Sequence, residues 1–335
     1  MQKVGVIGGG AWGTALAIVM AQAGREVVLW TRESELVEEI NAQHTNSLYL
    51  PDIALPENIE ATKSLSQAAD SDALLIVTPA QAVRQTLEIL KSDIYAGKPV
   101  VICSKGIELD TGFLMSQIAK DIIPDISVAL LSGPNFAREI ASGLPAAATL
   151  AITDKDVAQE LVDGLSSRNL RLYVQEDMIG AQIGGAVKNV IAIACGVVSG
   201  KDMGESARAA LITRGMVEMA RLASAMGARK ETLLGMCGMG DLMLTCTSLL
   251  SRNYSLGYAL GQGKTLDDIL GARHSVTEGY HTAEALMTMA RKNAVDMPIC
   301  ETVYAVLKNN LPVDVAIDRL LERPPVCVAE RKETQ

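Results

Sequence analysis

The chain opens with a glycine-rich turn whose spacing suits the binding of a phosphate group. Gly8, Gly10 and Gly13 stand between an apolar run and a helical pattern. In that context the first glycine permits a tight turn, the second lets the backbone approach a pyrophosphate, and the third lets helix and strand pack closely. The amino end of the helix then directs backbone N–H groups at the phosphates. The segment predicts a dinucleotide site, although a glycine turn that merely joins strand and helix is the simpler alternative.

Arg32 follows the second apolar run, where the ribose of a bound dinucleotide is usually read. An acidic residue there holds the 2′-hydroxyl of NAD, whereas an arginine can pair with the 2′-phosphate of NADP. Arg32 therefore favours NADP(H) as the cofactor, while the adjacent Glu33 leaves NAD(H) open. A solvated surface arginine is the alternative interpretation.

Three later segments hold polar residues where an ordinary core would not. Ser104-Lys105-Gly106 and the segment 132–137 each follow a predicted strand, at the edge where open sheets bind their ligands. Lys188 interrupts an apolar helical run at 184–194. A lysine in such a run either extends its amino group to the surface or is held at a functional site.

The elements that position these residues change in kind along the chain. In the first half, short β-branched runs alternate with helical patterns, which is typical of a parallel sheet with crossover helices. Strands are predicted at 3–7, 26–30, 73–78, 100–104, 128–132, 147–152 and 170–174, with helices at 12–23, 33–42, 80–91, 112–120, 135–142 and 154–166. After about residue 177 only helices are predicted, at 178–198, 205–226, 229–235, 254–261, 265–270, 279–292, 298–308 and 313–322.

This order predicts an α/β fold, with an N-terminal Rossmann-like, mostly parallel sheet and a second, all-helical domain. A chain of 335 residues is long enough for two cores. We expect a dinucleotide-binding domain at 1–180 and a helical substrate and catalytic domain at 181–335. A cleft between them is the expected active site.

The bulk properties exclude several classes of partner. The net charge of -9 argues against nucleic acid and anionic membranes, since both require a clustered basic surface. The longest apolar stretch, 190–198, is far shorter than the roughly 20 residues of a membrane-spanning helix, so stable membrane insertion is not expected.

The first strand begins within three residues of Met1, which leaves no room for an export signal. The six cysteines and three histidines show no zinc spacing, so we expect reduced thiols, no metal site and a cytoplasmic location.

At several motifs the sequence resembles bacterial NAD(P)-dependent glycerol-3-phosphate dehydrogenase. The matches occur in the family's order over nearly the whole chain. Two positions depart from the family's usual residues: many members have Ser or Thr where this chain has Asn135, and Ser where it has Ala11. The matching motifs are Gly-Pro-Asn-Phe-Ala at 133–137, Lys-Asn-Val-Ile-Ala-Ile at 188–193, the run 238–247, Ser-Arg-Asn at 251–253, Val-Thr-Glu-Gly at 276–279 and Met-Pro-Ile at 297–299.

The resemblance implies interconversion of sn-glycerol 3-phosphate and dihydroxyacetone phosphate, which supplies phospholipid synthesis. It implies that Lys188 is the general acid and base, and the apolar helix should lower its pKa by desolvation. Asp241 should orient Lys188 or the substrate hydroxyls, and its carboxylate should partly offset the desolvation. A homodimer is also implied.

The same correspondence assigns the remaining site residues. The substrate-binding positions are Lys105, Gly133, Asn135, Lys188, Asp241, Ser251, Arg252 and Asn253, and the cofactor-binding positions are Gly8, Gly10, Ala11, Trp12, Gly13, Arg32, Tyr49, Lys105, Ala137, Arg252, Val276 and Glu278. A serine, an arginine and an asparagine at 251–253 suit a phosphate dianion. Two alternatives are a dehydrogenase of hydroxy acids or ketoacids with a helical second domain, and a non-catalytic NADP-binding protein. The second is disfavoured by the presence of both Lys188 and Asp241.

Overall fold

A single eight-stranded sheet forms the first half of the protein. The computed structural model describes residues 1–272 and 276–324. The strand order is β3-β2-β1-β4-β5-β6-β7-β8, and every neighbouring pair is parallel except β6 and β7, which are antiparallel. The strands are β1 (Lys3–Ile7), β2 (Glu26–Trp30), β3 (Ile59–Thr62), β4 (Ala73–Ile76), β5 (Pro99–Ile102), β6 (Ser127–Ser132), β7 (Ala146–Ala151) and β8 (Leu170–Gln175).

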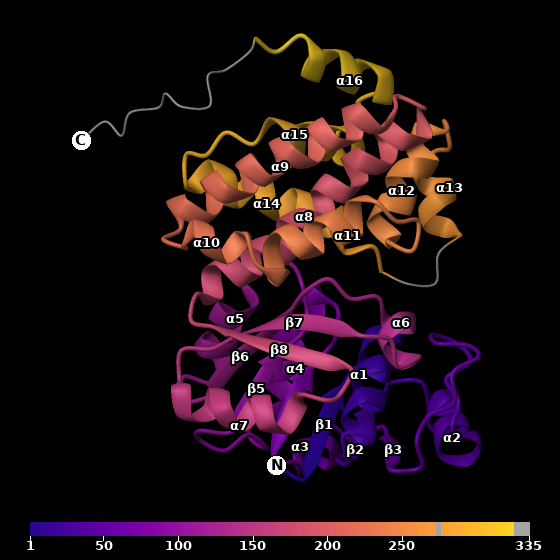
Figure 1. Cartoon of the computed structure of the whole chain (residues 1–335), viewed down its shortest axis with the longest axis vertical. Helices are drawn as coiled ribbons and strands as arrows, with labels where there is room; N and C mark the ends of the chain where they lie inside the picture. The colour runs from indigo at the N-terminus through magenta and orange to yellow at the C-terminus, as the bar shows by residue number, and fades with distance from the viewer. Residues whose placement is uncertain (273–275, 325–335) are drawn as a thin grey trace.

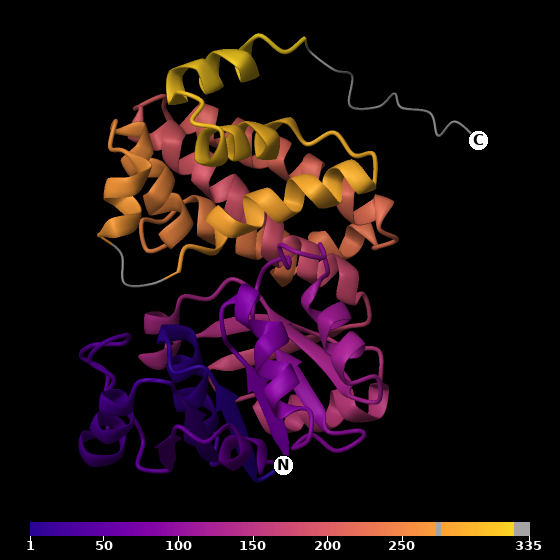
Figure 2. The same cartoon turned by 180° about the vertical axis from the view of Figure 1, so that it is seen from behind.

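Helices cover both faces of this sheet, as the two opposite views show (Figures 1 and 2). Successive strand residues point to opposite faces, so Leu75 joins one buried cluster while Leu74 and Ile76 join the other. The first cluster is covered by α1 (Ala11–Gln22), α2 (Ser34–Gln43), α6 (Ala137–Ala141) and α7 (Lys155–Leu165). The second is covered by α3 (Leu65–Ala69), η1 (Ala80–Ala82), α4 (Val83–Leu90) and α5 (Met115–Ile122).

A long apolar helix, α8 (Met178–Gly200), forms the core of the second half. Asp177 caps its first turn by accepting a hydrogen bond from the Gly180 N–H at 2.9 Å, and residues 180–196 are all buried. The surrounding elements are α9 (Glu205–Ala225), α10 (Lys230–Leu233), the π-helical turn η2 (Met236–Gly240), α11 (Asp241–Cys246), α12 (Arg252–Gly261), α13 (Leu266–Gly271), α14 (Glu278–Lys292), α15 (Pro298–Lys308) and α16 (Val313–Leu321). α8 is long and apolar enough to cross a membrane, but 83% of its apolar window is buried inside the protein. It is therefore a core helix.

The predicted fold class is confirmed, and four elements were missed: β3, α3, η2 and α11. β3 is a four-residue strand at the sheet edge, and its one exposed residue, Glu60, breaks the apolar run. α3 has five residues, too few for a helical periodicity to emerge. The segment η2 to α11 lies among glycines, which usually mark loops. The expected domain boundary, 180/181, falls in the first turn of α8 and stays a prediction.

The five cysteines that the structure describes, at 103, 195, 237, 246 and 300, are buried free thiols. Cys327 lies outside the described residues.

Candidate active site

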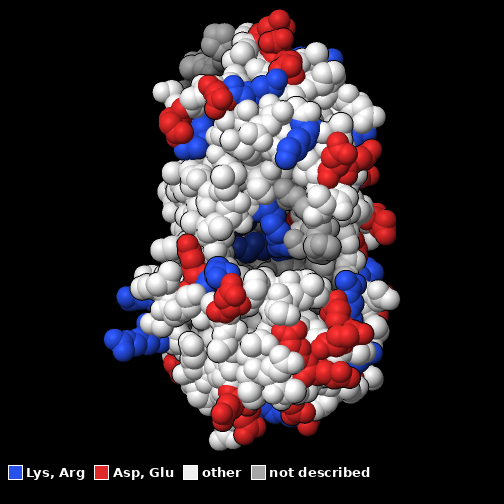
Figure 3. Space-filling model, turned by 90° about the vertical axis from the view of Figure 1, so that its right-hand side faces the viewer, with Lys and Arg blue, Asp and Glu red and all other residues white. Residues whose placement is uncertain are grey.

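The carboxyl ends of the central strands form the edge of the sheet that faces the helical half. The chain winds outward from β1 to β3 and then returns to β4 on the other side of β1, so the strand order reverses between β1 and β4. Open α/β sheets bind their ligands in the crevice at such a reversal. Figure 3 shows a hollow at the level where the two halves meet, with Lys or Arg side chains inside it.

The glycine turn leaves β1 at this reversal and has the geometry that a dinucleotide requires. Gly8 has a φ of 134°, and a Cβ atom there would lie 2.8 Å from the Val77 carbonyl oxygen. A Cβ at Gly13 would lie 1.8 Å from the Gly8 carbonyl oxygen, so neither position tolerates a side chain. A Cβ at Gly10, by contrast, would meet nothing within 4 Å. The turn is therefore closed on the sheet side and open at Gly10, where a pyrophosphate would approach.

Three other predicted cofactor residues belong to the elements around this turn. Ala11 and Trp12 begin α1, Ala137 begins α6, and α1 and α6 pack against each other. All three are half-buried, and the buried Trp12 Nε1 has no hydrogen-bond partner among the described residues. Buried polar atoms usually have a partner, so this indole N–H fits a ligand in the crevice.

Asn46 supports the turn and was not predicted. Its side chain is fully buried and donates to the Gly9 carbonyl oxygen at 2.9 Å and to Thr14 Oγ1 at 2.7 Å. Its Oδ1 accepts the Tyr49 N–H at 3.0 Å. Asn46 therefore links the glycine turn to the loop that carries Tyr49. A lone asparagine 37 positions from its partner has no periodic pattern, so the sequence offered no signal for it.

Arg32 and Tyr49 meet at Glu33, just beyond the end of β2. Glu33 Oε1 accepts hydrogen bonds from Arg32 Nε at 3.0 Å and from the Tyr49 hydroxyl at 3.1 Å. Its Oε2 accepts one from the Thr31 hydroxyl at 2.5 Å. Partial burial opposes ionisation of Glu33, but these donors outweigh it and hold the pKa of Glu33 at about 2. The predicted arginine therefore lies beside a carboxylate that is ionised at neutral pH.

Lys105, Lys188 and Asp241 form one charged cluster between the two halves. Asp241 Oδ1 accepts from Lys188 Nζ at 2.6 Å and Oδ2 accepts from Lys105 Nζ at 2.6 Å. Lys188 also donates to Thr245 Oγ1 at 2.8 Å, and Lys105 to the Gly133 carbonyl oxygen at 3.1 Å. The side chain of Asp241 is 2% exposed and that of Lys188 is 10% exposed. The predicted pairing of Lys188 with Asp241 is thus present, and Thr245 is a partner that was not predicted.

The environment of Lys188 perturbs its ionisation in the expected direction. Burial lowers the pKa of Lys188 to about 8, and the Asp241 carboxylate partly offsets this effect. Lys105 is a second cation beside the same carboxylate and lowers the pKa of Lys188 further. Near neutral pH, Lys188 therefore exchanges its proton far more readily than an exposed lysine does.

Gly184 explains how Asp241 comes so close to a helix of the core. A Cβ at Gly184 would lie 2.4 Å from the Cys237 carbonyl oxygen, so only glycine lets η2 pack against α8 at this depth. α11 begins at the end of η2 with Asp241 as its first residue. An acidic residue in the first turn is also favoured by the helix dipole.

The loop after β6 contributes its backbone and one amide. The Gly133 carbonyl oxygen holds Lys105, and Asn135 Nδ2 donates to the Ala147 carbonyl oxygen at 3.1 Å. The Asn135 Oδ1 atom is buried and has no partner within the described part of the chain. The loop thus leaves one unsatisfied acceptor two residues after the carbonyl that binds Lys105.

The segment 251–253 begins α12, and the side chains of Ser251 and Asn253 bond to the protein itself. Ser251 Oγ caps the helix by accepting the Tyr254 N–H at 3.2 Å. Asn253 donates to Asn189 Oδ1 at 2.9 Å and accepts the Gly279 N–H at 2.9 Å, which ties α12 to α8 and α14. This use of Asn253 in helix packing was not expected.

Arg252 and Glu278 are a second pair of charged groups, of which Arg252 is exposed and Glu278 is half-buried. Partial desolvation lowers the pKa of Arg252, whereas the charge of Glu278 raises it. Glu278 Oε1 accepts the Ala80 N–H at 3.2 Å, and its Oε2 is buried with no partner in the ranges described. Val276 is 40% exposed, at the edge of the segment 273–275 that lies outside the described residues.

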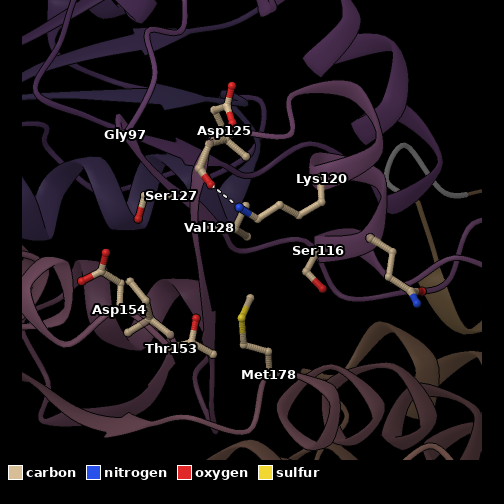
Figure 4. Close-up of a pocket in the computed structure, with 12 residues that line it drawn as sticks. Gly97, Ser116, Lys120, Asp125, Ser127, Val128, Thr153, Asp154 and Met178 are labelled. Atoms are coloured by element: carbon tan, nitrogen blue, oxygen red, sulfur yellow. Dashed lines mark hydrogen bonds between the residues drawn. The ribbon is translucent and has the colours of Figure 1, made fainter.

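A second cavity, of about 450 Å³, lies at the opposite edge of the sheet (Figure 4). It adjoins the start of β6 and the end of the antiparallel β7, and none of the predicted site residues lines it. Lys120 points across it to the Ile126 carbonyl oxygen at 2.6 Å, as the dashed line shows. The predicted site residues are therefore separate from this cavity.

The protein combines a glycine turn that is open to a pyrophosphate with a buried lysine that can exchange a proton near neutral pH. This combination is typical of NAD(P)-dependent oxidoreductases. Comparison with known proteins narrows this class. Residues 3–158 match the N-terminal family of NAD-dependent glycerol-3-phosphate dehydrogenase, and residues 177–318 match its C-terminal family. The chain belongs to the NAD-dependent glycerol-3-phosphate dehydrogenase family.

Individual relatives agree with this assignment over nearly their full length. The glycerol-3-phosphate dehydrogenase (NAD(P)+) of Parvibaculum lavamentivorans is 55% identical over 323 residues, which cover 96% of this chain and 97% of the relative. The crystal structure of glycerol-3-phosphate dehydrogenase from Coxiella burnetii has a TM-score of 0.93 at 37% identity, covering 96% of this chain and 99% of that one. D-mandelate dehydrogenase with NADH has a TM-score of 0.63 at 17% identity, covering 96% of this chain and all of that one, which shows a shared fold alone.

Proposed function

We propose that this protein interconverts sn-glycerol 3-phosphate and dihydroxyacetone phosphate with NAD(P), and that Lys188 is its general acid and base. The observation that carries the proposal is the Asp241 carboxylate, which holds the ammonium groups of Lys188 and Lys105 side by side at 2.6 Å each. The names of the close relatives support the same substrate pair.

Lys188 has the chemistry that ketone reduction needs. The bound nicotinamide supplies the hydride for the carbonyl carbon. The carbonyl oxygen then requires a proton, and the Lys188 ammonium has three N–H donors, two of which are held by Asp241 and Thr245. The third N–H is left to meet the substrate oxygen. In the reverse direction neutral Lys188 accepts the proton of the alcohol, and a pKa of about 8 keeps both forms accessible near neutral pH.

Lys105 and Asp241 shape the charge around the reacting oxygen. Two ammonium groups share one carboxylate, so the cluster keeps a net positive charge in a buried site. That charge favours the oxyanion that develops as hydride arrives at the carbonyl carbon. We assign Lys105, Gly133 and Asn135 to substrate binding, with Lys105 also beside the cofactor.

Arg252 is the candidate for the charged phosphate contact. It is the second residue of the segment 251–253 and is exposed, and a guanidinium pairs well with a phosphate dianion. Ser251 accepts a hydrogen bond but still has its own O–H to donate, and Asn253 Nδ2 retains one N–H beyond its bond to Asn189. Both side chains can therefore contribute to phosphate binding while they support α12.

The remaining assignments are the cofactor-binding residues, the cellular location and the oligomeric state. We assign the cofactor to a set of residues around the glycine turn, the end of β2 and the start of α14, which is Gly8, Gly10, Ala11, Trp12, Gly13, Arg32, Tyr49, Lys105, Ala137, Arg252, Val276 and Glu278. We further propose a cytoplasmic homodimer that supplies glycerol 3-phosphate for phospholipid synthesis.

The test is a spectrophotometric assay of cofactor oxidation with a panel of carbonyl substrates. We expect dihydroxyacetone phosphate to be reduced with NADPH, NADH or both, and pyruvate and other 2-ketoacids to be left unchanged. Reduction of a ketoacid without reduction of dihydroxyacetone phosphate would favour the hydroxy-acid dehydrogenase alternative. Tight cofactor binding without turnover of any substrate would favour the non-catalytic alternative.

A further inference from the structure

Glu33 stands at the centre of a hydrogen-bond network at the ribose end of the predicted cofactor site. Thr31, Arg32 and Tyr49 all donate to its two carboxylate oxygens. No role is implied for Glu33 by the resemblance to the family, which assigns Arg32 and Tyr49 alone.

The network fixes Glu33 from two sides. The Thr31 side chain is buried and lies 2.6 Å from where a Cβ on Gly9 would be, so it is packed on the glycine turn. The Tyr49 backbone is held by Asn46, which is itself bonded to the same turn. Glu33 therefore stays in place relative to the turn that would carry the pyrophosphate.

Arg32, in contrast, is largely open to solvent, with Glu33 as its main partner and Tyr49 as a weaker one. Its side chain is 80% exposed, whereas that of Glu33 is 26% exposed. An exposed arginine in a single ion pair can rotate toward another anion at small cost. The fixed carboxylate and the movable guanidinium thus form a pair in which only the arginine can follow a ligand.

We propose that Glu33 is a specificity-determining residue, which weakens binding of the cofactor 2′-phosphate by retaining Arg32 and by keeping a negative charge beside it. The proposal rests on the assignment of Arg32 to the 2′ end of the cofactor. NADPH must draw Arg32 away from Glu33 and bring a dianion near a carboxylate. NADH brings only a hydroxyl, which a carboxylate accepts. Glu33 therefore narrows the preference for NADP(H) that Arg32 alone would create.

The test is equilibrium binding of NADPH and NADH, measured by the change in nicotinamide fluorescence, with no substrate present. The quantity of interest is the ratio of the NADH Kd to the NADPH Kd. We expect Glu33→Gln, which keeps an acceptor for the neighbouring donors, to raise this ratio by about 3- to 10-fold, since one charge acts on a dianion at a partly exposed site. Glu38→Gln on α2 makes the same charge change at an exposed position, and we expect it to leave the ratio within about twofold of the wild-type value.

Two further variants separate the role of Arg32 from a direct effect of Glu33. We expect Arg32→Ala to lower the ratio, and Glu33→Gln to have a smaller effect in the Arg32→Ala background, where only the charge of Glu33 acts on the 2′-phosphate. An unchanged or lower ratio in Glu33→Gln would overturn the proposal, as would a full Glu33→Gln effect without Arg32. Turnover of dihydroxyacetone phosphate is measured separately, so a failure of the proposed reaction leaves this binding test intact.

Discussion

Replacing Asp241 by Asn should shift the pH dependence of catalysis toward acid. Asp241 is the only carboxylate that the described residues place within hydrogen-bond distance of Lys188, and it also holds Lys105. The substitution keeps the size of the side chain but removes the negative charge. Lys188 would then remain buried beside a second ammonium group with nothing to offset desolvation.

The magnitude follows from the perturbed ionisation of Lys188, whose pKa is about 8 in the wild-type site. Loss of an adjacent opposite charge lowers a lysine pKa by about 1 to 3. A fall of about 2 would reduce the protonated fraction of Lys188 at pH 7.5 from about three quarters to about 3%. We therefore expect ketone reduction to slow roughly 25-fold at pH 7.5 and much less at pH 6.

The assay is a pH profile of kcat in both directions for the wild type and Asp241→Asn. In reduction, Lys188 must be protonated, so activity falls as pH rises through the pKa; in oxidation, neutral Lys188 is needed, so activity rises there. The falling limb of the reduction profile and the rising limb of the oxidation profile should therefore move together, from about pH 8 to lower pH. A matched control is Asp314→Asn, which removes a carboxylate 2.6 Å from the more exposed Lys201 at the end of α8. Limbs that stay in place, or move to higher pH, would refute the role of Lys188.

Three further variants test the site and its support. Lys188→Met should reduce turnover at least about 100-fold with little change in the NADPH Kd, and unchanged turnover would exclude Lys188 as the proton donor. In urea unfolding at pH 7, the free energy of unfolding of this variant should rise by up to about 3 kcal/mol. The reason is that a buried lysine with a pKa of about 8 disfavours the folded state at every pH below that value. Glu218 of α9 is buried, and its carboxylate accepts the N–H groups of Ile299 and Cys300 at the start of α15. Burial raises the pKa of Glu218 to about 7 from an ordinary 4.5, so the unfolded state releases its proton first as pH rises. Stability relative to Glu218→Gln should therefore fall by about 3 kcal/mol between pH 4 and pH 8 in urea titrations, and a constant difference would contradict this. Gly13→Ala places a Cβ 1.8 Å from the Gly8 oxygen, so NADPH binding measured by fluorescence should be lost, and wild-type affinity would show that the turn is not the cofactor site.

The sequence predicted those parts of the protein that depend on local patterns. The glycine spacing at 8–13 lies within one strand-turn-helix unit, and the alternation of strands and helices indicated the sheet. Asp241 carried no such signal, because its position depends on the π-helical turn η2 packing against Gly184 of α8. Asn46 and Thr245 were missed for the same reason, since each acts through a partner that is distant in the chain. The resemblance supplied Asp241 as a partner of Lys188 or of the substrate hydroxyls, and the fold places its carboxylate 2.6 Å from Lys188 Nζ.

The same helix explains both the chemistry and the packing of the site. α8 is apolar because it is the core of the helical half, and that burial is what lowers the pKa of Lys188 toward the range in which a proton can be exchanged. A charged residue in such a core disfavours folding unless it has a partner, and Asp241 provides one while its second oxygen binds Lys105 at the edge of the sheet. Lys105 in turn is bonded to Gly133 of the loop after β6. One carboxylate therefore stabilises a buried lysine and joins α8 to the sheet that carries the glycine turn, so displacing Lys188, the proposed proton donor, would break an ionic link between the two halves.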